Sequence, residues 1–485
     1  MKIKQLLEDI KCEKYAVKEG VNITSLCIKD KNCSPGCAFF CLKGNNYNGE
    51  DFAKQAVNNG ATLIVAERYL DGVNAMQIVV KNARSAFAKM SANFFGNPQK
   101  QLKTVGVVGT NGKSTVCTAI ASILNAEGVT CGSIGTFGAT YDKINIDTGF
   151  TTPDSFELFK IMSEMLKCGI KIVCMELSAH AIYYKKVPIK FDVLIFTNCT
   201  HDHLDFFGNF EKYREVKRSA FSSRSARVAV INGDDPLGKE ICACRDSGVI
   251  TYGISDPSDN FAIDISPTPS GCNYVINLFD AVYRINSKLY GEFNVYNMLA
   301  VATTCALCGI KTDRIASRLN ELERISGRME KISDKPNVFI DYAHTPDGLK
   351  RALLELAKIK PKTSKLICVF GCGGNRDTSK RAIMGEISGK YADFTIITSD
   401  NPRFEDGNLI IDEIESGVRR YSLDYITVAD REKAIEYAVN VANANDYLLI
   451  AGKGSENYQE IMGVFKRFCD KQIAKKYILS KYDRL

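Results

Sequence analysis

The segment from Lys103 to Thr115 restricts the possible folds of this chain more than any other segment does. It reads KTVGVVGTNGKST, and the amphipathic run VCTAIASILNAEG follows it. The β-branched residues before the glycines predict a strand, and the amphipathic run predicts a helix. In such a strand–turn–helix unit, backbone N–H groups and the helix dipole bind phosphates, Lys113 reaches the terminal phosphates and Ser114 faces a magnesium ion. The segment therefore predicts an α/β nucleotide-binding domain.

This phosphate loop departs from the general P-loop pattern at one position. Where that pattern has a glycine, the chain has Val107. We therefore expect a particular subclass of nucleotide loop. A glycine turn with a chance lysine is the alternative, and the strand and helix on either side of the turn argue against it.

The composition is that of a soluble enzyme with several domains. The chain has 485 residues, 45% hydrophobic and 25% charged, and this length predicts about three domains. No apolar run approaches the roughly 18 residues of a membrane span. The N-terminal stretch MKIKQLLEDIKCEKY lacks the apolar core of a signal peptide. We therefore expect a cytoplasmic protein with no membrane span.

The charge pattern favours a small anionic substrate over a nucleic acid. The formal net charge of +7 is modest for this length, and basic residues are mixed with acidic ones throughout. A nucleic-acid surface would need a basic stripe with interleaved aromatic residues, which the sequence lacks. We therefore expect no nucleic-acid partner.

The 18 cysteines are distributed as buried thiols and not as a disulfide framework. Many, such as Cys117 and Cys368, lie in apolar predicted strands or helices, where a thiol acts as a small hydrophobic group in a reducing compartment. Cys33, Cys37 and Cys41 are spaced by four residues, a spacing that permits a metal site. Because no fourth ligand lies nearby in the sequence, we favour buried thiols over a metal site there.

Strand and helix patterns divide the chain into three segments, 1–98, 99–327 and 328–485. The first has short strand-like runs (CAFFCL, TLIVAE and AMQIVV) and a helix around 86–95. In the other two, apolar strands alternate with helices, which predicts a parallel sheet covered by helices in each. The predicted fold is α/β, with a small mixed α/β N-terminal domain, a central P-loop ATPase-like parallel-sheet domain and a C-terminal Rossmann-like domain.

Polar residues suited to catalysis follow the predicted strands of the central segment. The strand IVCMEL contains Glu176 and leads to Ser178, and the strand VLIFTN leads into CTHDHLDFFGNF, which contains His203. The helix YREVKRSAF then carries Lys217. Sites in α/β proteins form where parallel strands end, so we expect these side chains near the phosphate loop.

The motifs GTNGKST, MELSAHA, TNCTHDHLDFFG and YREVK resemble, in order and spacing, the central-domain motifs of the Mur ligases. These are ATP-dependent amide-forming enzymes of peptidoglycan synthesis. The resemblance implies the catalytic residues Lys113, Glu176, His203 and Lys217. It also implies that Ser114 and Glu176 hold one Mg²⁺, and that Glu176, His203 and a carbamylated Lys217 hold a second.

The chemistry of these residue types agrees with the implied magnesium sites. Mg²⁺ prefers hard oxygen ligands, and two ions can neutralise the crowded charge of a phosphoryl transfer. A lysine would repel Mg²⁺, but addition of CO₂ turns it into an oxygen ligand of opposite charge. The alternatives are an exposed helical lysine at Lys217 and a capping or core histidine at His203.

Further motifs imply that ATP, the co-substrate, lies between the second and third segments. The runs YGEFNVYNMLA, GRME and DYAHTPD resemble nucleotide-binding segments of the family. Arg328 suits a phosphate as a fixed fork of donors, and Asp341 can accept hydrogen bonds from ribose hydroxyls. The implied ATP-binding residues are Gly109, Thr110, Asn111, Gly112, Lys113, Ser114, Thr115, Asn297, Arg328 and Asp341.

Three C-terminal runs resemble the family member that adds meso-diaminopimelate. They are GCGGNRDTSKR (371–381), SDNPR (399–403) and AGKGSENYQ (451–459). Diaminopimelate differs from lysine by a second carboxylate, which a guanidinium can bind in a bidentate way. The alternative for Arg403 is a loop arginine in a surface ion pair. The implied diaminopimelate-binding residues are Arg376, Asp400, Asn401, Pro402, Arg403, Gly452 and Glu456.

The contacts to the UDP-linked substrate are the least regular part of the resemblance. The N-terminal domain has Lys29-Asp30-Lys31 where the family has Asp-Ser-Arg, and Asn375 and Ser455 replace an aspartate and a histidine. Lys186 stands where the family has an arginine. The residues implied for this substrate are Thr151, Thr152, Ser178 and Lys186.

The expected function is the ATP-dependent addition of meso-diaminopimelate to UDP-N-acetylmuramoyl-L-alanyl-D-glutamate through an acyl phosphate. Residues 1–98 would bind the UDP substrate, 99–327 would bind ATP and 328–485 would bind the amino acid. We expect a monomer. The alternatives are the same reaction with L-lysine and a divergent, catalytically weak paralogue, while a folylpolyglutamate-type ligase fits the DNPR run and the N-terminal segment poorly.

Overall fold

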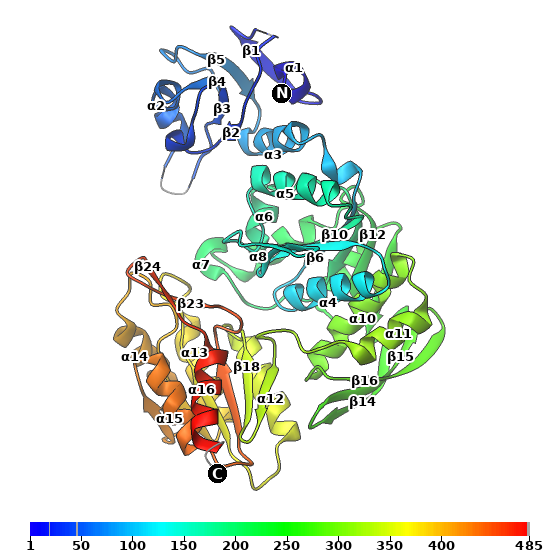
Figure 1. The fold of residues 1–485 in the computed structure, drawn as a ribbon, viewed down its shortest axis with the longest axis vertical. Coiled ribbons are helices and arrows are strands. Elements are labelled where there is room, and N and C mark those ends of the chain that lie inside the picture. The colour runs from blue at the N-terminus through cyan, green and yellow to red at the C-terminus, as the bar shows by residue number, and fades with distance from the viewer. Residues whose placement is uncertain (19, 45–46, 483–485) are drawn as a thin grey trace.

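The structure, a computed structural model, describes residues 1–18, 20–44 and 47–482. Three sheets follow one another along the chain, and Figure 1 shows them as three bodies, with the N-terminal sheet at the top and the C-terminal sheet at the bottom. This arrangement confirms the predicted α/β fold of three parts. The exact boundaries at 98/99 and 327/328 stay predictions. Within the described residues, no helix has the length and apolar character needed to cross a membrane.

The N-terminal sheet has five strands, of which only β1 runs antiparallel to its neighbour. In spatial order they are β1 (Cys12–Tyr15), β5 (Met76–Val80), β4 (Ala61–Ala66), β3 (Cys37–Phe40) and β2 (Leu26–Cys27). The helices of this part are α1 (Ile3–Leu6), η1 (Asp30–Asn32), η2 (Gly49–Phe52), α2 (Ala53–Asn58), α3 (Ala83–Phe94) and η3 (Pro98–Lys100).

The central sheet has eleven strands. In spatial order they are β16 (Ala281–Ser287), β15 (Gly271–Leu278), β14 (Asn260–Thr268), β13 (Val249–Gly253), β12 (Ala226–Asn232), β11 (Phe191–Phe196), β6 (Lys103–Val108), β10 (Ile172–Leu177), β7 (Cys131–Gly135), β8 (Gly138–Tyr141) and β9 (Ile144–Ile146). The helices of this part are α4 (Lys113–Ala126), α5 (Ser155–Lys167), α6 (Ala179–Tyr183), α7 (Leu204–Phe207), α8 (Phe210–Ser219), α9 (Pro236–Ala243), α10 (Glu292–Leu307) and α11 (Thr312–Glu321).

The middle strands of this sheet are apolar throughout because helices cover both of their faces. Val105 of β6 and Cys174 of β10 pack in one core with α4, α10 and α11. Val173 and Met175 of β10 point the other way and pack in a second core with α5 and α9. Two-sided burial is the usual reason for continuous apolar runs in parallel strands.

The central sheet is mixed, with antiparallel strands at its edges in addition to the parallel strands that the sequence predicted. Strands β14, β15 and β16 form an antiparallel meander at one edge, and β8 and β9 extend the other edge. In β15 the buried residues Tyr274, Ile276 and Leu278 alternate with more exposed ones, a period-two pattern typical of a one-sided antiparallel strand. That alternation was the signal in the sequence.

The C-terminal sheet has six strands, all parallel except β17. In spatial order they are β17 (Glu330–Asp334), β18 (Asn337–Asp341), β22 (Tyr447–Ala451), β19 (Leu366–Phe370), β20 (Phe394–Ile397) and β21 (Tyr425–Thr427). The helices are α12 (Pro346–Ile359), α13 (Lys380–Tyr391), α14 (Gly407–Val418), α15 (Arg431–Val441) and α16 (Asp470–Tyr482), and β23 (Tyr458–Ile461) pairs with β24 (Val464–Arg467) in a separate ribbon.

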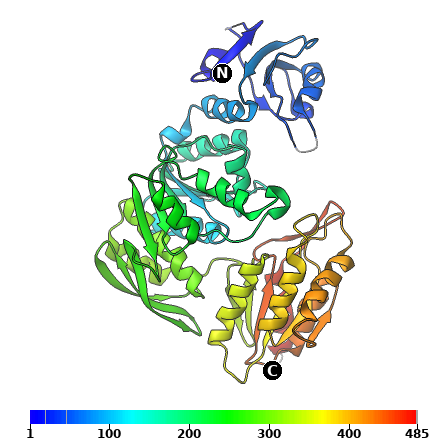
Figure 2. The same ribbon diagram turned by 180° about the vertical axis from the view of Figure 1, so that it is seen from behind.

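Helices cover both faces of this sheet as well. Figure 1 looks onto α15 and α16, and Figure 2, from behind, looks onto α12 and α13 in yellow-green and yellow. A fully buried ion pair, Arg431 with Asp470, joins α15 to α16 through two hydrogen bonds of 2.8 and 2.7 Å. The same guanidinium donates to the carbonyls of Ser399 (3.2 Å) and Ala451 (2.9 Å), where two predicted substrate segments begin.

We predict that Asp470→Ala lowers the free energy of unfolding of the C-terminal part by about 3–5 kcal/mol, because it leaves Arg431 buried without its counter-ion. Urea unfolding followed by far-UV circular dichroism measures this loss. The control is Glu432→Gln, which breaks an exposed pair with Lys476 between the same two helices. Equal losses in the two variants would contradict a special role for the buried pair.

Candidate active site

The phosphate loop connects β6 to α4, and the side chain of Lys113 folds back onto the backbone of this loop. Lys113 Nζ donates to the carbonyls of Gly109 at 2.8 Å and Thr110 at 2.9 Å. Burial lowers the pKa of Lys113, and the nearby carboxylates of Glu176 and Asp202 act against that shift. Together with the N–H groups of the first turn of α4, this ammonium forms a cationic loop suited to phosphate oxygens.

The two loop glycines are required by close contacts and not only by the turn. A Cβ on Gly109 would overlap Thr197 Oγ1, and a Cβ on Gly112 would overlap Asn297 Oδ1. Gly112 also has a φ of +87°, in the left-handed region that favours glycine. The predicted residue Asn297, on α10, is thereby packed directly against the loop.

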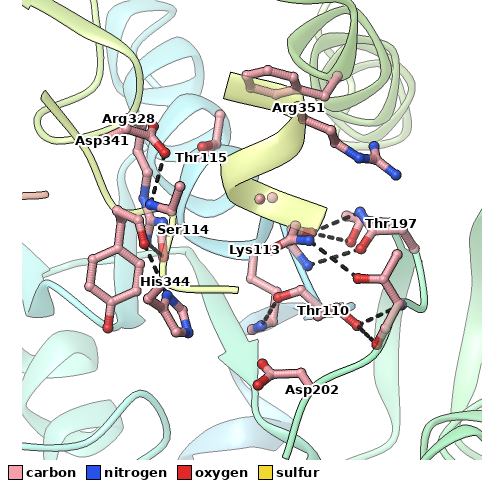
Figure 3. Close-up of a pocket in the computed structure, with 18 of the residues that line it drawn as sticks. Thr110, Lys113, Ser114, Thr115, Thr197, Asp202, Arg328, Asp341, His344 and Arg351 are labelled. Carbon is pink, nitrogen blue, oxygen red and sulfur yellow. Dashed lines mark hydrogen bonds between the residues drawn. The ribbon is translucent and has the colours of Figure 1, made fainter. Parts of the chain in front are cut away.

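A cavity of about 790 Å³ lies at this loop and is lined from both the central and the C-terminal parts. Figure 3 shows Thr110, Thr197 and Asp202 on the side of Lys113, and Arg328, Asp341 and His344 grouped beside Ser114. The predicted site residues that line it are Thr110, Asn111, Gly112, Lys113, Ser114, Thr115, Thr151, Glu176, His203, Asn297, Arg328, Asp341, Arg376, Asp400, Asn401, Arg403, Gly452 and Glu456.

Glu176, near the end of β10, places a nearly buried carboxylate in the wall of the cavity. Its side chain accepts from the backbone N–H of Thr136 (2.8 Å) and from the Thr136 hydroxyl (3.2 Å). Glu176 is only 2% exposed, and within residues 1–18, 20–44 and 47–482 no basic side chain forms an ion pair with it. A buried carboxylate without a cationic partner is costly, so this position suits a bound cation.

His203 immediately precedes α7 as its N-cap residue and has a left-handed backbone (φ +55°). Its Nε2 lies 3.5 Å from the Asp202 carboxylate, and its ring meets that of His180 edge to face, with centroids 5.1 Å apart. Burial lowers the pKa of His203, although Asp202 opposes the shift. A neutral imidazole keeps a lone pair available for a metal ion.

Lys217 is a buried lysine of α8 that contacts the phosphate loop. Its Nζ donates to Thr110 Oγ1 at 2.6 Å and lies 4.2 Å from the centroid of the Tyr213 ring. Lys217 is 1% exposed, so the alternative of an exposed helical lysine is wrong. Burial lowers the pKa of Lys217 to about 7. Lys217 does not line the cavity itself but touches it through Thr110.

The C-terminal wall of the cavity is formed at the start of the third segment. Arg328 donates to Ser114 Oγ at 3.0 Å and stacks over the Tyr342 ring at 4.4 Å. Asp341, at the end of β18, accepts from the N–H groups of Met329 (2.6 Å) and Ala343 (2.8 Å), and burial raises its pKa. These hydrogen bonds hold Arg328 and Asp341, which are both predicted to bind the nucleotide, beside α4.

Three polar side chains of the C-terminal part form a hydrogen-bonded network in another part of the cavity. Lys453 Nζ, fully buried, donates to Asn401 Oδ1 and to Glu456 Oε2, both at 3.0 Å. Asn401 Nδ2 also donates to Glu456 Oε2 at 3.0 Å. Gly452 has a φ of +112°, and a Cβ there would lie 2.7 Å from the Asp400 carboxylate. Glu456 is thus held in one orientation by two donors.

Two arginines reach this part of the cavity, and they differ in their partners. Arg403 Nε pairs with Glu460 at 3.1 Å, and its Nη1 donates to the carbonyl of Gly374 at 2.8 Å. A guanidinium has five N–H donors, so further donors of Arg403 remain for a ligand. Within the described ranges, Arg376 forms no hydrogen bond or ion pair. Pro402, by contrast, does not line the cavity.

The residues predicted to contact the UDP-linked substrate divide into two groups. Thr151 lines the cavity, and its hydroxyl lies 3.2 Å from that of Thr136. Thr152 donates to the carbonyl of Glu176 (2.8 Å) and accepts from the N–H of Ser178, while Lys186 pairs with Asp154 at 2.7 Å. Thr152, Ser178 and Lys186 therefore hold the local structure together outside the cavity lining.

The sequence interpretation missed several residues that position the predicted ones. Thr136 binds both oxygens of Glu176, and it follows β7 just as other predicted site residues follow their strands. Lys453 stands inside the AGKGSENYQ run, and Asp347, which accepts from Asn111 Nδ2 at 3.3 Å, stands inside DYAHTPD. Glu460, the partner of Arg403, had no signal in the sequence.

Comparisons with known proteins match nearly the whole chain to one protein family. Residues 22–95 match the Mur ligase family, catalytic domain, residues 107–305 match the Mur ligase middle domain, and residues 327–454 match the Mur ligase, glutamate ligase domain. The chain is 38% identical to the UDP-N-acetylmuramoyl-L-alanyl-D-glutamate--2,6-diaminopimelate ligase of Geobacillus thermodenitrificans, across 98% of this chain and 99% of that relative. It is 37% identical to ligase 1 of that name from Clostridium acetobutylicum, across 99% of both.

Solved structures of the same family have a similar fold. A structure of a UDP-N-acetylmuramoyl-L-alanyl-D-glutamate--2,6-diaminopimelate ligase aligns with a TM-score of 0.71 at 27% identity over 99% of both chains. The MurF ligase of Thermotoga maritima in complex with ADP aligns with a TM-score of 0.63 at 20% identity over 96% of this chain and 98% of that one, which bears on the fold alone. Given these matches over nearly its full length, the chain belongs to the Mur ligase family.

Proposed function

We propose that this chain joins meso-2,6-diaminopimelate to UDP-N-acetylmuramoyl-L-alanyl-D-glutamate, with ATP as co-substrate and Mg²⁺ as cofactor. The observation that carries the proposal is one cavity that is lined both by the phosphate loop and by the side chains of Arg403 and Glu456. Relatives that bear the name of this ligase are 35–38% identical to the chain over almost its whole length.

The reaction joins a carboxylate to an amine in two steps. The D-glutamate γ-carboxylate takes the γ-phosphoryl group of ATP and ADP leaves. The amine of diaminopimelate then displaces phosphate from the acyl carbon, loses one proton and leaves an amide. Lys113 and the N–H groups at the start of α4 donate to the phosphate oxygens as their charge increases. Arg328, fixed by Ser114 and Tyr342, adds a second cation from the C-terminal side.

The residues of the central wall fit magnesium. Glu176 offers a carboxylate with no counter-ion among the described residues, and Ser114 offers a hydroxyl oxygen. We assign Ser114 and Glu176 to one Mg²⁺, and Glu176, His203 and a carbamylated Lys217 to the second. When bound, the ions neutralise the charge of the ATP phosphates and of the transferring phosphoryl group. The carbamate fits the position of Lys217, because its amine is buried against the phosphate loop.

The C-terminal end of the cavity suits the distal amino acid centre of diaminopimelate. Arg403 and Arg376 offer donors to its carboxylate, and Glu456, oriented by Lys453 and Asn401, accepts from its ammonium. Lysine lacks the carboxylate and would leave Arg376 and the remaining donors of Arg403 without a ligand partner. The curated relatives reported above are all named for diaminopimelate, so the lysine alternative is not favoured.

Retention of the whole phosphate-transfer set speaks against a catalytically weak paralogue. A silent module would not need Lys113, Glu176, His203 and Lys217 together beside one cavity. We further propose that residues 1–98 bind the UDP part of the substrate, that 99–327 bind ATP and that 328–485 bind the amino acid. We propose a monomer that acts in the cytoplasm.

The direct test is to incubate the purified chain with the UDP-dipeptide, MgATP and either diaminopimelate or L-lysine, and to determine product masses. We expect the diaminopimelate adduct and ADP. An adduct formed equally well with lysine would contradict the proposed specificity, and absence of any adduct would support the paralogue.

We predict that Lys113→Ala lowers kcat at least about 100-fold without unfolding the protein, because the loop loses its cation for the transferring phosphoryl group. Steady-state ADP release and a thermal melt measure the two properties. The control is Lys239→Ala, which removes an exposed lysine paired with Asp256 in the same part of the chain. Near-normal turnover in Lys113→Ala would disprove the assigned role of the loop.

We predict that Lys217→Ala is nearly inactive and that short carboxylic acids restore part of its rate, because they can occupy the position of the carbamate. Lys217→Arg should stay inactive with or without them, since a guanidinium does not take up CO₂. The exposed lysine of the same helix supplies the control Lys212→Ala. A wild-type rate in either Lys217 variant would rule out the carbamate.

We predict that Arg403→Ala loses kcat/KM for diaminopimelate by roughly 30- to 5,000-fold, as expected for about 2–5 kcal/mol from one desolvated charge pair. The KM values for ATP and the UDP-dipeptide should change little. Lysine should be a poor substrate of the wild type and should change little in the variant.

The control for this series is Arg420→Ala, which removes an exposed arginine of the same part of the chain. Equal losses for lysine and diaminopimelate in Arg403→Ala would mean that Arg403 supports the loop through Glu460 and does not recognise the substrate.

A further inference from the structure

Three cysteines of the N-terminal part gather at one point that the proposed reaction does not use. The Sγ atoms of Cys27, Cys33 and Cys37 all lie within 4.8 Å of one another. None of them lines the cavity described above. From the sequence, Cys33, Cys37 and Cys41 were the candidate metal ligands. Buried thiols were favoured over a metal site because no fourth ligand lies nearby in the sequence. In the structure, Cys27 of the preceding strand takes the place of Cys41, so the group again offers three sulfurs.

The backbone around the three thiols is fixed by the fold. Cys27 ends β2 and Cys37 begins β3, and these two strands pair in parallel. Cys33 follows η1 in the connecting loop, where its N–H donates to the carbonyl of Asp30 at 2.9 Å. Asn59 Nδ2, at the end of α2, also donates to that carbonyl at 3.0 Å. The three sulfurs are therefore presented by neighbouring, well-anchored segments.

The hydrogen bonds of these thiols are weak, so a metal ion can replace them at little cost. Cys27 Sγ donates to the carbonyl of Asn32 at 3.2 Å, and Cys33 Sγ donates to that of Lys29 at 3.8 Å. Ser25 Oγ lies 3.7 Å from Cys27 Sγ. In an apolar surrounding, a thiol is a weak donor and contributes little through such contacts.

We propose that Cys27, Cys33 and Cys37 bind one thiophilic metal ion, Zn²⁺, as three thiolates, with water as the fourth ligand. Three sulfurs bound at about 2.3 Å around a tetrahedral ion lie roughly 3.8 Å apart, so rotation of the half-buried Cys33 side chain closes most of the remaining difference. Soft thiolates select such an ion over Mg²⁺, which prefers the oxygen ligands of the ATP cavity. Three protein ligands and one water form an open zinc site.

Zinc binds thiolates, so each Zn–S bond that a thiol forms releases one proton to solvent, and the affinity of the site for Zn²⁺ should rise with pH. The bound ion would tie the loop between β2 and β3 to both strands.

The first experiment measures zinc in the full-length protein after incubation with ZnCl₂ and removal of excess metal. We expect Cys33→Ser to hold one equivalent less Zn²⁺ per chain than the wild type. Cys12→Ser is the matched control, because it removes another half-buried thiol of the N-terminal part and should keep the full amount. Equal zinc content in the wild type and both variants would overturn the proposal.

A second experiment begins with the wild-type protein. Wild-type protein is alkylated with and without Zn²⁺, and the modified cysteines are identified by peptide mass spectrometry. Zn²⁺ should protect Cys33 at least tenfold and leave the rate at the exposed Cys244 unchanged. Co²⁺ in place of Zn²⁺ should give the charge-transfer absorption of sulfur ligands, and this band should be absent in Cys33→Ser. Unprotected Cys33, or a disulfide among the three cysteines in the purified protein, would overturn the proposal.

Discussion

The hydrogen bond from Arg328 to Ser114 connects the two halves of the site, and the rest of the catalytic arrangement depends on it. Ser114 belongs to the first turn of the loop helix, and Arg328 belongs to the start of the C-terminal segment. Asn111 and Asp347 make a second contact across the same junction. Neither part alone encloses the cavity, because its lining comes from both. A phosphoryl transfer followed by attack of an amine needs both halves at once.

In both halves, the residues at the junction lie at the ends of neighbouring parallel strands. In the central sheet, β6 and β10 are parallel neighbours, so the phosphate loop and Glu176 come to the same edge. In the C-terminal sheet, β18 and β22 are parallel neighbours, so Asp341 and the segment after Ala451 also share an edge. Parallel strands deliver their following loops to one side. Two such edges facing each other form the cavity to which we assign the nucleotide and the amino acid.

The sequence predicted the features whose signals are local, and it missed the features that depend on residues far apart along the chain. The phosphate loop and the parallel strands were predicted because their signals are local and strong. The meander of β14 to β16 was missed because its alternation is weaker than a continuous apolar run. Partners such as Thr136 and Glu460 lie far along the chain from Glu176 and Arg403, so no local pattern pairs them with these residues. The grouping of Cys27 with Cys33 and Cys37 likewise depends on the pairing of β2 with β3.

The central claim is that a carboxylate is activated as an acyl phosphate in this cavity. The most direct measurement uses UDP-N-acetylmuramoyl-L-alanyl-D-glutamate labelled with ¹⁸O in the γ-carboxylate, together with MgATP and diaminopimelate. The mass of the released inorganic phosphate then reports the path of the oxygen. Our account predicts one ¹⁸O atom in each phosphate, because the amine displaces a phosphate that keeps the carboxylate oxygen. Unlabelled phosphate beside a newly formed amide would contradict it.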